Sequence, residues 1–169
     1  SYSPAGSKIC TGSFDFTLAI WDADTGEKLH NLLGHTGGVI GHAWSPDSKI
    51  IASCSFDGTI RQWSAETGKL IVTIVAHSQR VTGISWTEDG KTLITSSEDG
   101  SVKIWTASSG ILVTNLQGHV RPVQSLAFSP DATRVVSSSE DCSLRIWDTS
   151  EIKLDVSASK KPIVASRLS

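Results

Sequence analysis

The sequence has no long apolar run and very little net charge. No segment approaches the roughly 20 apolar residues of a membrane-spanning helix, and no charged and then apolar leader stands at the N-terminus, so neither a membrane span nor a secretory signal is expected. The net charge of -2 gives no sequence-wide reason to expect nucleic acid or an anionic membrane as a partner. The length of 169 residues is sufficient to bury a compact core.

Cysteine is scarce, and its spacing excludes the common metal motifs. Cys10, Cys54 and Cys142 are odd in number, and none has a close-spaced partner of the kind that zinc sites use. Cys10 and Cys54 lie in apolar, strand-like segments, so we expect free, buried thiols in a reducing intracellular compartment, cytoplasmic or nuclear. There is no Gly-rich phosphate loop and no interleaving of aromatic and basic residues. The sequence therefore predicts no cofactor, no metal and no small-molecule substrate.

What the sequence does contain is a period of 42 residues. Four tryptophans follow this step: Trp21, Trp63, Trp105 and Trp147. A column of aspartates and a column of hydroxyl residues keep it as well: Asp15, Asp57, Asp99 and Asp141, and Thr11, Ser53, Thr95 and Ser137. Three histidines complete the pattern: His35, His77 and His119. A fixed period of about 40 to 45 residues is typical of repeat units that stack on their neighbours to bury their apolar faces.

One period contains four short segments of strand character, separated by turn residues. In the third period the strands are expected over residues 81–86, 92–97, 101–106 and 111–116. No stretch has a helical period, so the fold is expected to be all-β. Four-stranded antiparallel units repeated around an axis are the blades of a β-propeller. We expect about four blades, an incomplete one over 1–34 and three over 35–76, 77–118 and 119–154, followed by a polar C-terminal tail over 155–169.

The recurring residues resemble the WD-repeat family over residues 1 to about 154. Its motif is matched at its spacing by Gly34-His35, Gly118-His119, Asp57-Gly58, Asp99-Gly100, Trp21-Asp22 and Trp147-Asp148. The third unit opens with Ala76-His77 instead, and Trp63-Ser64 and Trp105-Thr106 lack the final aspartate. Because this family usually closes rings of seven or eight blades, the resemblance implies that these blades are part of a larger propeller or of a truncated gene product. The regular repeat length also resembles the arrays of fungal NACHT-type nucleotide-binding proteins.

The His, Ser or Thr, and Asp columns contain the residue types of a hydrolase triad, but they recur. A catalytic constellation occurs once, whereas the set around His35 is repeated around His77 and His119. In an antiparallel blade the loop that carries the His and the turn that carries the Asp lie at the same end. The Asp can then accept from the His, the hydroxyl can bridge, and the indole can donate. In the family that the chain resembles, these four residues form a structural network, so we expect no enzymatic activity.

The same end of each blade is the expected partner-binding surface. Residues three and five places after each His, and the one before each Asp, are solvent-facing by default, and in the family they match positions that most often contact partners on the narrow face. They are Phe14 on the first blade, Gly38, Ile40 and Phe56 on the second, Arg80, Thr82 and Glu98 on the third, and Pro122, Gln124 and Glu140 on the fourth. Phe14, Ile40 and Phe56 are expected to form an apolar patch flanked by Arg80 and Glu98. The alternative is that the two phenylalanines only cover the Asp turns.

The predicted function is therefore a non-catalytic scaffold that docks proteins or peptides. The alternative is the ligand-sensing repeat region of a larger NACHT-type receptor. Self-association is a further expectation, since residues 163–168 fall near the positions of a first strand and could pair beside residues 8–11. The pairing would occur either across a dimer that builds an eight-bladed ring or within one strained chain; the alternative is a disordered tail. Asp15-Phe16 and Asp141-Cys142 place a side chain where other repeats have glycine, and we expect a slightly different turn there.

Overall fold

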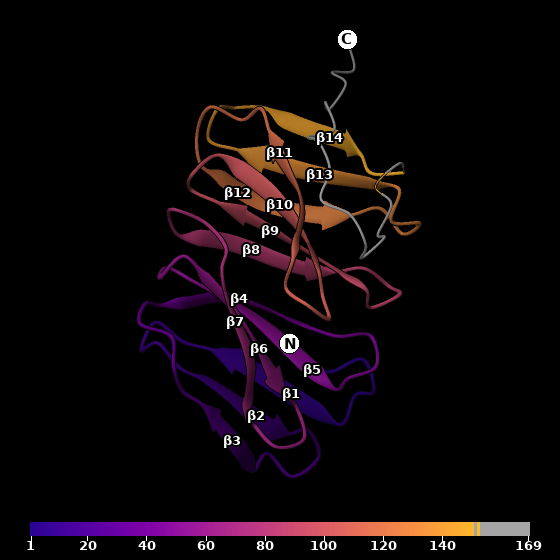
Figure 1. Cartoon of the computed structure of the whole chain (residues 1–169). Coiled ribbons are helices and arrows are strands. Elements are labelled where there is room, and N and C mark those ends of the chain that lie inside the picture. The colour runs from indigo at the N-terminus through magenta and orange to yellow at the C-terminus, as the bar shows by residue number, and fades with distance from the viewer. Residues whose placement is uncertain (151, 153–169) are drawn as a thin grey trace.

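The computed structural model describes residues 1–150 and residue 152, and within them every regular element is a strand. The strands form four antiparallel sheets that follow one another in chain order (Figure 1). The first sheet contains β1 (Lys8–Gly12), β2 (Leu18–Asp22) and β3 (Lys28–Leu32), and the second β4 (Val39–Trp44), β5 (Ile50–Ser55), β6 (Thr59–Ser64) and β7 (Leu70–Val75). The third contains β8 (Val81–Trp86), β9 (Thr92–Ser97), β10 (Ser101–Thr106) and β11 (Leu112–Gln117), and the fourth β12 (Val123–Phe128), β13 (Arg134–Ser139) and β14 (Leu144–Asp148).

These sheets confirm the expected all-β fold built from blade-like units. In each sheet the strands are hydrogen-bonded in the order in which they occur in the chain. The first three predicted strands of the third period are correct, and the fourth begins one residue later than predicted, at Leu112. Residues 155–169 of the predicted tail, and the strand suggested over residues 163–168, lie outside the described residues.

The register of the sheets repeats with the sequence period. Trp44 pairs with Ile51 where β4 ends, and the pairs of Trp86 with Leu93 and of Phe128 with Val135 are its equivalents. An isolated antiparallel bridge joins Tyr2 to Ile9 beside the first sheet. Tyr2 therefore occupies the place that the last residue of β4, β8 or β12 takes in the later sheets, as its register in the sequence predicts.

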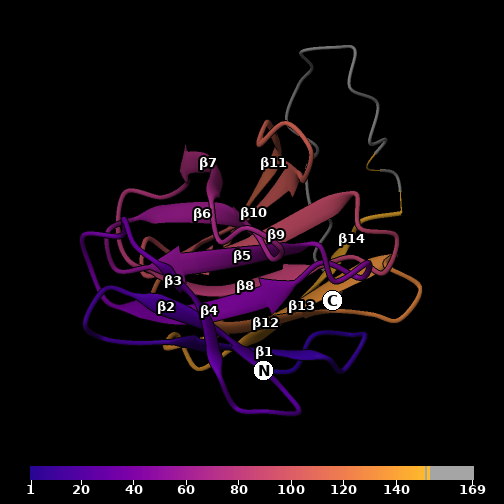
Figure 2. The same cartoon turned by 90° about the horizontal axis from the view of Figure 1, so that it is seen from below.

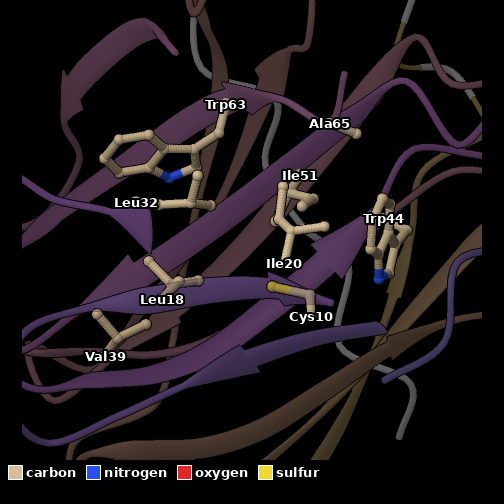
Figure 3. Packing of buried hydrophobic residues seen from close by; sticks show 9 residues of the cluster. All are labelled: Cys10, Leu18, Ile20, Leu32, Val39, Trp44, Ile51, Trp63 and Ala65. Carbon is tan, nitrogen blue, oxygen red and sulfur yellow. The ribbon is translucent and has the colours of Figure 1, made fainter. Parts of the chain in front are cut away.

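The hydrophobic core lies between successive sheets. One cluster joins Cys10, Leu18, Ile20 and Leu32 of the first sheet to Val39, Trp44, Ile51, Trp63 and Ala65 of the second (Figure 3). Two further clusters join the second sheet to the third and the third to the fourth in the same way. The strands β4, β8 and β12 lie side by side (Figure 2). We call the face of a sheet on the side of the next sheet in chain order its forward face and the opposite face its back face. At each of the three junctions a forward face packs on the back face of the next sheet.

The Phe16 and Cys142 turns have the same conformation as the glycine turns. The φ angles are +77° at Phe16 and +61° at Cys142, close to +79° at Gly58 and +80° at Gly100. The backbone N–H of Phe16 donates to Ser13 O as that of Gly58 donates to Ser55 O. The expectation of a different turn is wrong, because the same hydrogen bond closes the turn whichever residue occupies the position. Both side chains are held in the left-handed region, which non-glycine residues rarely adopt.

The three thiols are free, which confirms the expectation for Cys10 and Cys54, and they differ in burial. Cys10 and Cys54 are buried, and Cys142 is exposed. Burial raises the pKa of the Cys10 thiol to about 12 and that of the Cys54 thiol to about 12. The part of the chain that the structure describes holds no helix long and apolar enough to cross a membrane.

Candidate functional site

The structure brings together a His, a Ser, an Asp and a Trp in the second sheet. His35, in the loop before β4, has Nδ1 2.9 Å from Asp57 Oδ2 and Nε2 2.8 Å from Ser53 Oγ. The indole Nε1–H of Trp63 donates to the same Ser53 Oγ at 2.9 Å. An indole can only donate, a carboxylate can only accept, and burial lowers the pKa of His35, so its imidazole is neutral at neutral pH. The bonds therefore run in one direction from Trp63 through Ser53 and His35 to Asp57. This direction requires a neutral imidazole with its proton on Nδ1.

The same network recurs in the third and fourth sheets. His77 lies 3.0 Å from Asp99 and 2.8 Å from Thr95, to which Trp105 donates at 2.9 Å. His119 lies 2.8 Å from both Asp141 and Ser137, and Trp147 donates to Ser137 at 2.8 Å. In the first sheet Trp21 donates to Thr11 at 2.9 Å, while Asp15 accepts from Thr17.

Burial and hydrogen bonding set the charge state of the network. Burial lowers the pKa of His35 and lowers that of His77 to about 4, against the opposing effect of the aspartates. Burial acts to raise the pKa of Asp57, but hydrogen bonds from the Thr59 side chain, the Thr36 backbone and His35 outweigh it and lower the pKa to about 2. At neutral pH His77 is therefore neutral and Asp57 ionised.

The hydrogen-bond order of this network is that of a hydrolase triad, yet its hydroxyl group lies in the core. Ser53 and Thr95 are fully buried, and each hydroxyl oxygen already accepts a bond from an indole. A nucleophilic hydroxyl needs access to the atom that it attacks. The arrangement instead ties the loop before the first strand of a sheet to the turn between its second and third strands.

The two columns of residues expected to bind a partner are joined by backbone hydrogen bonds. Phe56 N donates to Gly38 O at 2.9 Å, and Glu98 N donates to Arg80 O at 3.0 Å. The equivalent bond in the fourth sheet runs from Glu140 N to Pro122 O at 3.0 Å. The position before each of these aspartates therefore lies next to the position three places after the His, on the rim where the networks end.

Side chains on this rim form a continuous row across the first three sheets. The rings of Phe14 and Phe56 lie 5.7 Å apart, centroid to centroid, at an interplanar angle of 49°. The Arg80 guanidinium lies over the Phe56 ring, 4.4 Å from its centroid, and its Nη1 is 3.7 Å from Glu98 Oε1. We call Phe14, Phe56, Arg80 and Glu98 the rim row. On the fourth sheet Gln124 Nε2 donates to Glu140 Oε1 at 2.7 Å.

Three of the expected rim residues are not free surface. Gly38 is buried, and a Cβ added there would lie 2.7 Å from Phe14 Cδ1, so the expectation that it faces solvent is wrong. Ile40 is half-buried and packs on the core between the second and third sheets, because β4 lies against β8. The expected patch of Phe14, Ile40 and Phe56 therefore reduces to the two aromatic rings. Thr82 is half-buried and donates to Val123 O at 2.6 Å.

One exposed rim residue was missed by the sequence reasoning. Val120 is 85% exposed beside His119. With Arg121, it borders a hollow of about 440 Å³ whose wall includes Glu98, Pro122 and Glu140. A signal for it exists, since Val120 takes the position that Thr36 and Ser78 hold in the preceding repeats. Among the described residues no group of His, Cys, Asp and Glu is arranged to hold a metal ion.

Comparison with known proteins places the repeats in a family. The family described as WD domain, G-beta repeat, matches residues 1–22, 26–64, 68–106 and 110–148. The chain is 51% identical over 47 residues to ribosome assembly protein 4 of Chaetomium thermophilum, a match that covers 27% of this chain and 9% of that protein. It is 44% identical over 50 residues to WD repeat-containing protein 1 of Bos taurus, covering 28% of this chain and 8% of the relative.

A third relative has similar coverage. The U5 small nuclear ribonucleoprotein 40 kDa protein of Pongo abelii is 43% identical over 47 residues, which are 28% of this chain and 13% of that protein. The matched part of the chain thus spans only about a tenth of the length of these relatives. The family match, by contrast, takes in most of the chain, and it confirms the resemblance that the Trp, Asp and His columns indicate. The chain belongs to the WD40 family of WD domain, G-beta repeat proteins.

Proposed function

We propose that the protein is a non-catalytic scaffold that binds a protein or peptide partner on the rim row. WD40 domains typically mediate protein interactions, which supports this class of function. The buried networks around His35, His77 and His119 hold the rim loops in place and use no side chain of the rim row.

The observation that carries the proposal is the state of Phe14. Its side chain is 71% exposed, although it already contacts the Phe56 ring. Phe56 is half-buried, and its ring and backbone cover Gly37 and Gly38, so turn cover accounts for Phe56. Phe14 also lies over Gly38, but most of its surface remains in water, which this cover does not require. An aromatic ring held by a neighbour loses little conformational freedom when a partner covers it, and aromatic and Arg side chains dominate binding hot spots.

The chemistry of the row indicates the kind of partner. An apolar side chain of the partner would lie on Phe14, and hydrogen-bonding groups would meet the Arg80 and Glu98 pair, which is itself partly exposed. Beyond this pair, the hollow beside Val120 offers a second apolar contact bordered by Glu140 and Arg121. The row therefore suits an extended peptide or loop with an apolar residue followed by polar ones.

The test is a peptide-array or pull-down comparison of the wild type with the double variant Phe14→Ser, Phe56→Ser. The matched control is Leu70→Ser, Ile71→Ser, which also removes two exposed apolar side chains but lies on β7, away from the rim. Selective loss of the peptides that the wild type binds supports the proposal, provided that the circular dichroism spectrum is unchanged. Unchanged binding by a folded rim variant would refute it.

Two further parts of the proposal have their own tests. We place the protein in a reducing intracellular compartment because its two core thiols are free; localisation of a tagged chain tests this. The alternative role, as the sensing repeats of a NACHT-type receptor, is tested by the full-length reading frame. A nucleotide-binding domain encoded upstream would favour the receptor, and its absence a free-standing scaffold.

A further inference from the structure

The fourth sheet exposes apolar side chains whose equivalents in the other sheets are buried. Leu144 is 63% exposed, whereas Val102, Ile60 and Leu18, one, two and three periods earlier in the sequence, are fully buried. Ile146 is 45% exposed, whereas Ile20 and Ile104 are buried. In the first three sheets these positions form the forward face, which packs on the next sheet. The forward face of the fourth sheet therefore has the composition of an internal face without the neighbour.

The first sheet shows the complementary feature on its back face. Tyr2 is 66% exposed, although Trp44, its equivalent one period later, is buried in the first core cluster. Trp21 and Ile9 are half-buried, whereas Trp63 and Ile51 are buried against the preceding sheet. Tyr2, Ile9 and Trp21 are of the residue types that cover a forward face at each of the three internal junctions.

We infer that the forward face of the fourth sheet binds the back face of the first sheet of a second copy of this chain. The three internal junctions show what covers a forward face. The covering sheet supplies a Trp, an aliphatic strand residue and the aromatic residue that ends its first strand. Trp21, Ile9 and Tyr2 supply this set at the opposite end of the same chain. The contact is head to tail, and two such contacts between two copies would produce a closed dimer of eight sheets.

This inference is independent of the proposed function, because neither face contains a residue of the rim row. Its driving force is apolar burial, since Leu144, Ile146 and Tyr2 leave water together. Two other occupants of the forward face are conceivable, namely residues 153–169 of the same copy or a further repeat of a longer polypeptide. The experiment distinguishes both from a second copy.

The mass of the purified chain in solution is the first measurement, by sedimentation velocity over a range of concentrations. We expect twice the monomer mass of 18.0 kDa at the higher concentrations. The forward variant Leu144→Glu, Ile146→Glu and the back variant Tyr2→Glu should each be folded monomers, because the substituted side chains are exposed in the single copy. The control Leu70→Glu, Ile71→Glu should remain a dimer.

Mixing the two monomeric variants tests the head-to-tail geometry. The forward variant retains an intact back face and the back variant an intact forward face, so an equimolar mixture should recover a species of two copies through one contact. Truncation after residue 152 should leave the wild-type dimer in place.

Three results would overturn the inference. One is a wild-type chain that stays monomeric at every concentration. If truncation after residue 152 then creates a dimer, residues 153–169 cover the face in the full chain; if the truncated chain is also monomeric, the face is left to a further repeat. Another is a dimer that persists in the forward variant. The third is a mixture of the two variants in which both remain monomers.

Discussion

The indole Nε1–H of Trp63 lies 2.9 Å from Ser53 Oγ and donates a hydrogen bond to it. The hydroxyl accepts this bond through a lone pair and keeps its proton for His35 Nε2, and the imidazole, which burial keeps neutral by lowering its pKa, donates from Nδ1 to Asp57. Each polar group of the network has a partner, although Ser53 is fully buried. The stability of the sheet therefore depends on the hydroxyl as well as on the Trp.

The first prediction concerns this hydroxyl. Ser53→Ala leaves the Trp63 N–H and His35 Nε2 buried without their partner, and it should lower the free energy of unfolding by about 1 to 3 kcal/mol. Thr11→Val is the matched control, because Trp21 is half-buried and Thr11 is exposed, so its loss should cost less. Urea unfolding of both variants measures the difference. Equal costs for the two would show that burial of the network is not what matters.

The second prediction concerns pH. The pKa of His77 falls from 6.5 to about 4 on folding, so the unfolded chain binds protons first as the pH decreases. The stability that neutral His77 contributes is complete above pH 6.5 and is lost as the pH falls towards 4, a change of about 3 kcal/mol. The pKa of Asp57 falls from 3.8 to about 2, so a further loss follows below pH 3.8.

Urea unfolding at fixed pH values between 7.5 and 4 measures this dependence. In His77→Gln the starting stability should be lower, and the decrease between pH 6.5 and 4 should be smaller, because the titrating group is gone. A wild-type stability that stays constant down to pH 4 would contradict the prediction.

The third prediction concerns the left-handed turns. Cys142→Gly should raise the free energy of unfolding by about 1 kcal/mol, because glycine adopts a φ of +61° without the clash of a Cβ. Cys142→Ala is the control and should give no such gain, since it retains the Cβ. Conversely, Gly58→Ala should destabilise the fold, because its φ is +79° and the added Cβ would lie 2.8 Å from His77 O. Thermal unfolding of the three variants measures their stability. It should be highest in Cys142→Gly, lower in the wild type and lowest in Gly58→Ala.

The fourth prediction concerns thiol chemistry. Burial raises the pKa of Cys10 and of Cys54 to about 12, whereas Cys142 is exposed. A disulfide reagent at pH 8 should modify one thiol of the native chain rapidly, and all three only after unfolding. In Cys142→Ala the rapid reaction should disappear. Rapid modification of a second thiol in the folded protein would contradict this. It would show that the junction between the first and second sheets, which buries Cys10, or that between the second and third, which buries Cys54, opens.

Much of the fold follows from the sequence because its determinants are local and repeated. The period of the Trp, Asp and hydroxyl columns places each strand within a residue or so, as β8, β9 and β10 show. Antiparallel connection then brings the His loop to the Asp turn whatever the neighbouring sheets do, so the members of the network could be named before their distances were known.

The tertiary structure alone decided which of these residues lie in water. Leu144 and Val102 occupy the same column of the sequence, yet one is exposed and the other buried, because burial depends on the sheet that packs against a face and not on the pattern of the strand. The same reason buries Gly38 under Phe14 and directs Ile40 into the core. The contact of Arg80 with Phe56 likewise joins two repeats across a junction, and the period, which relates equivalent positions, carries no information on which different side chains meet there.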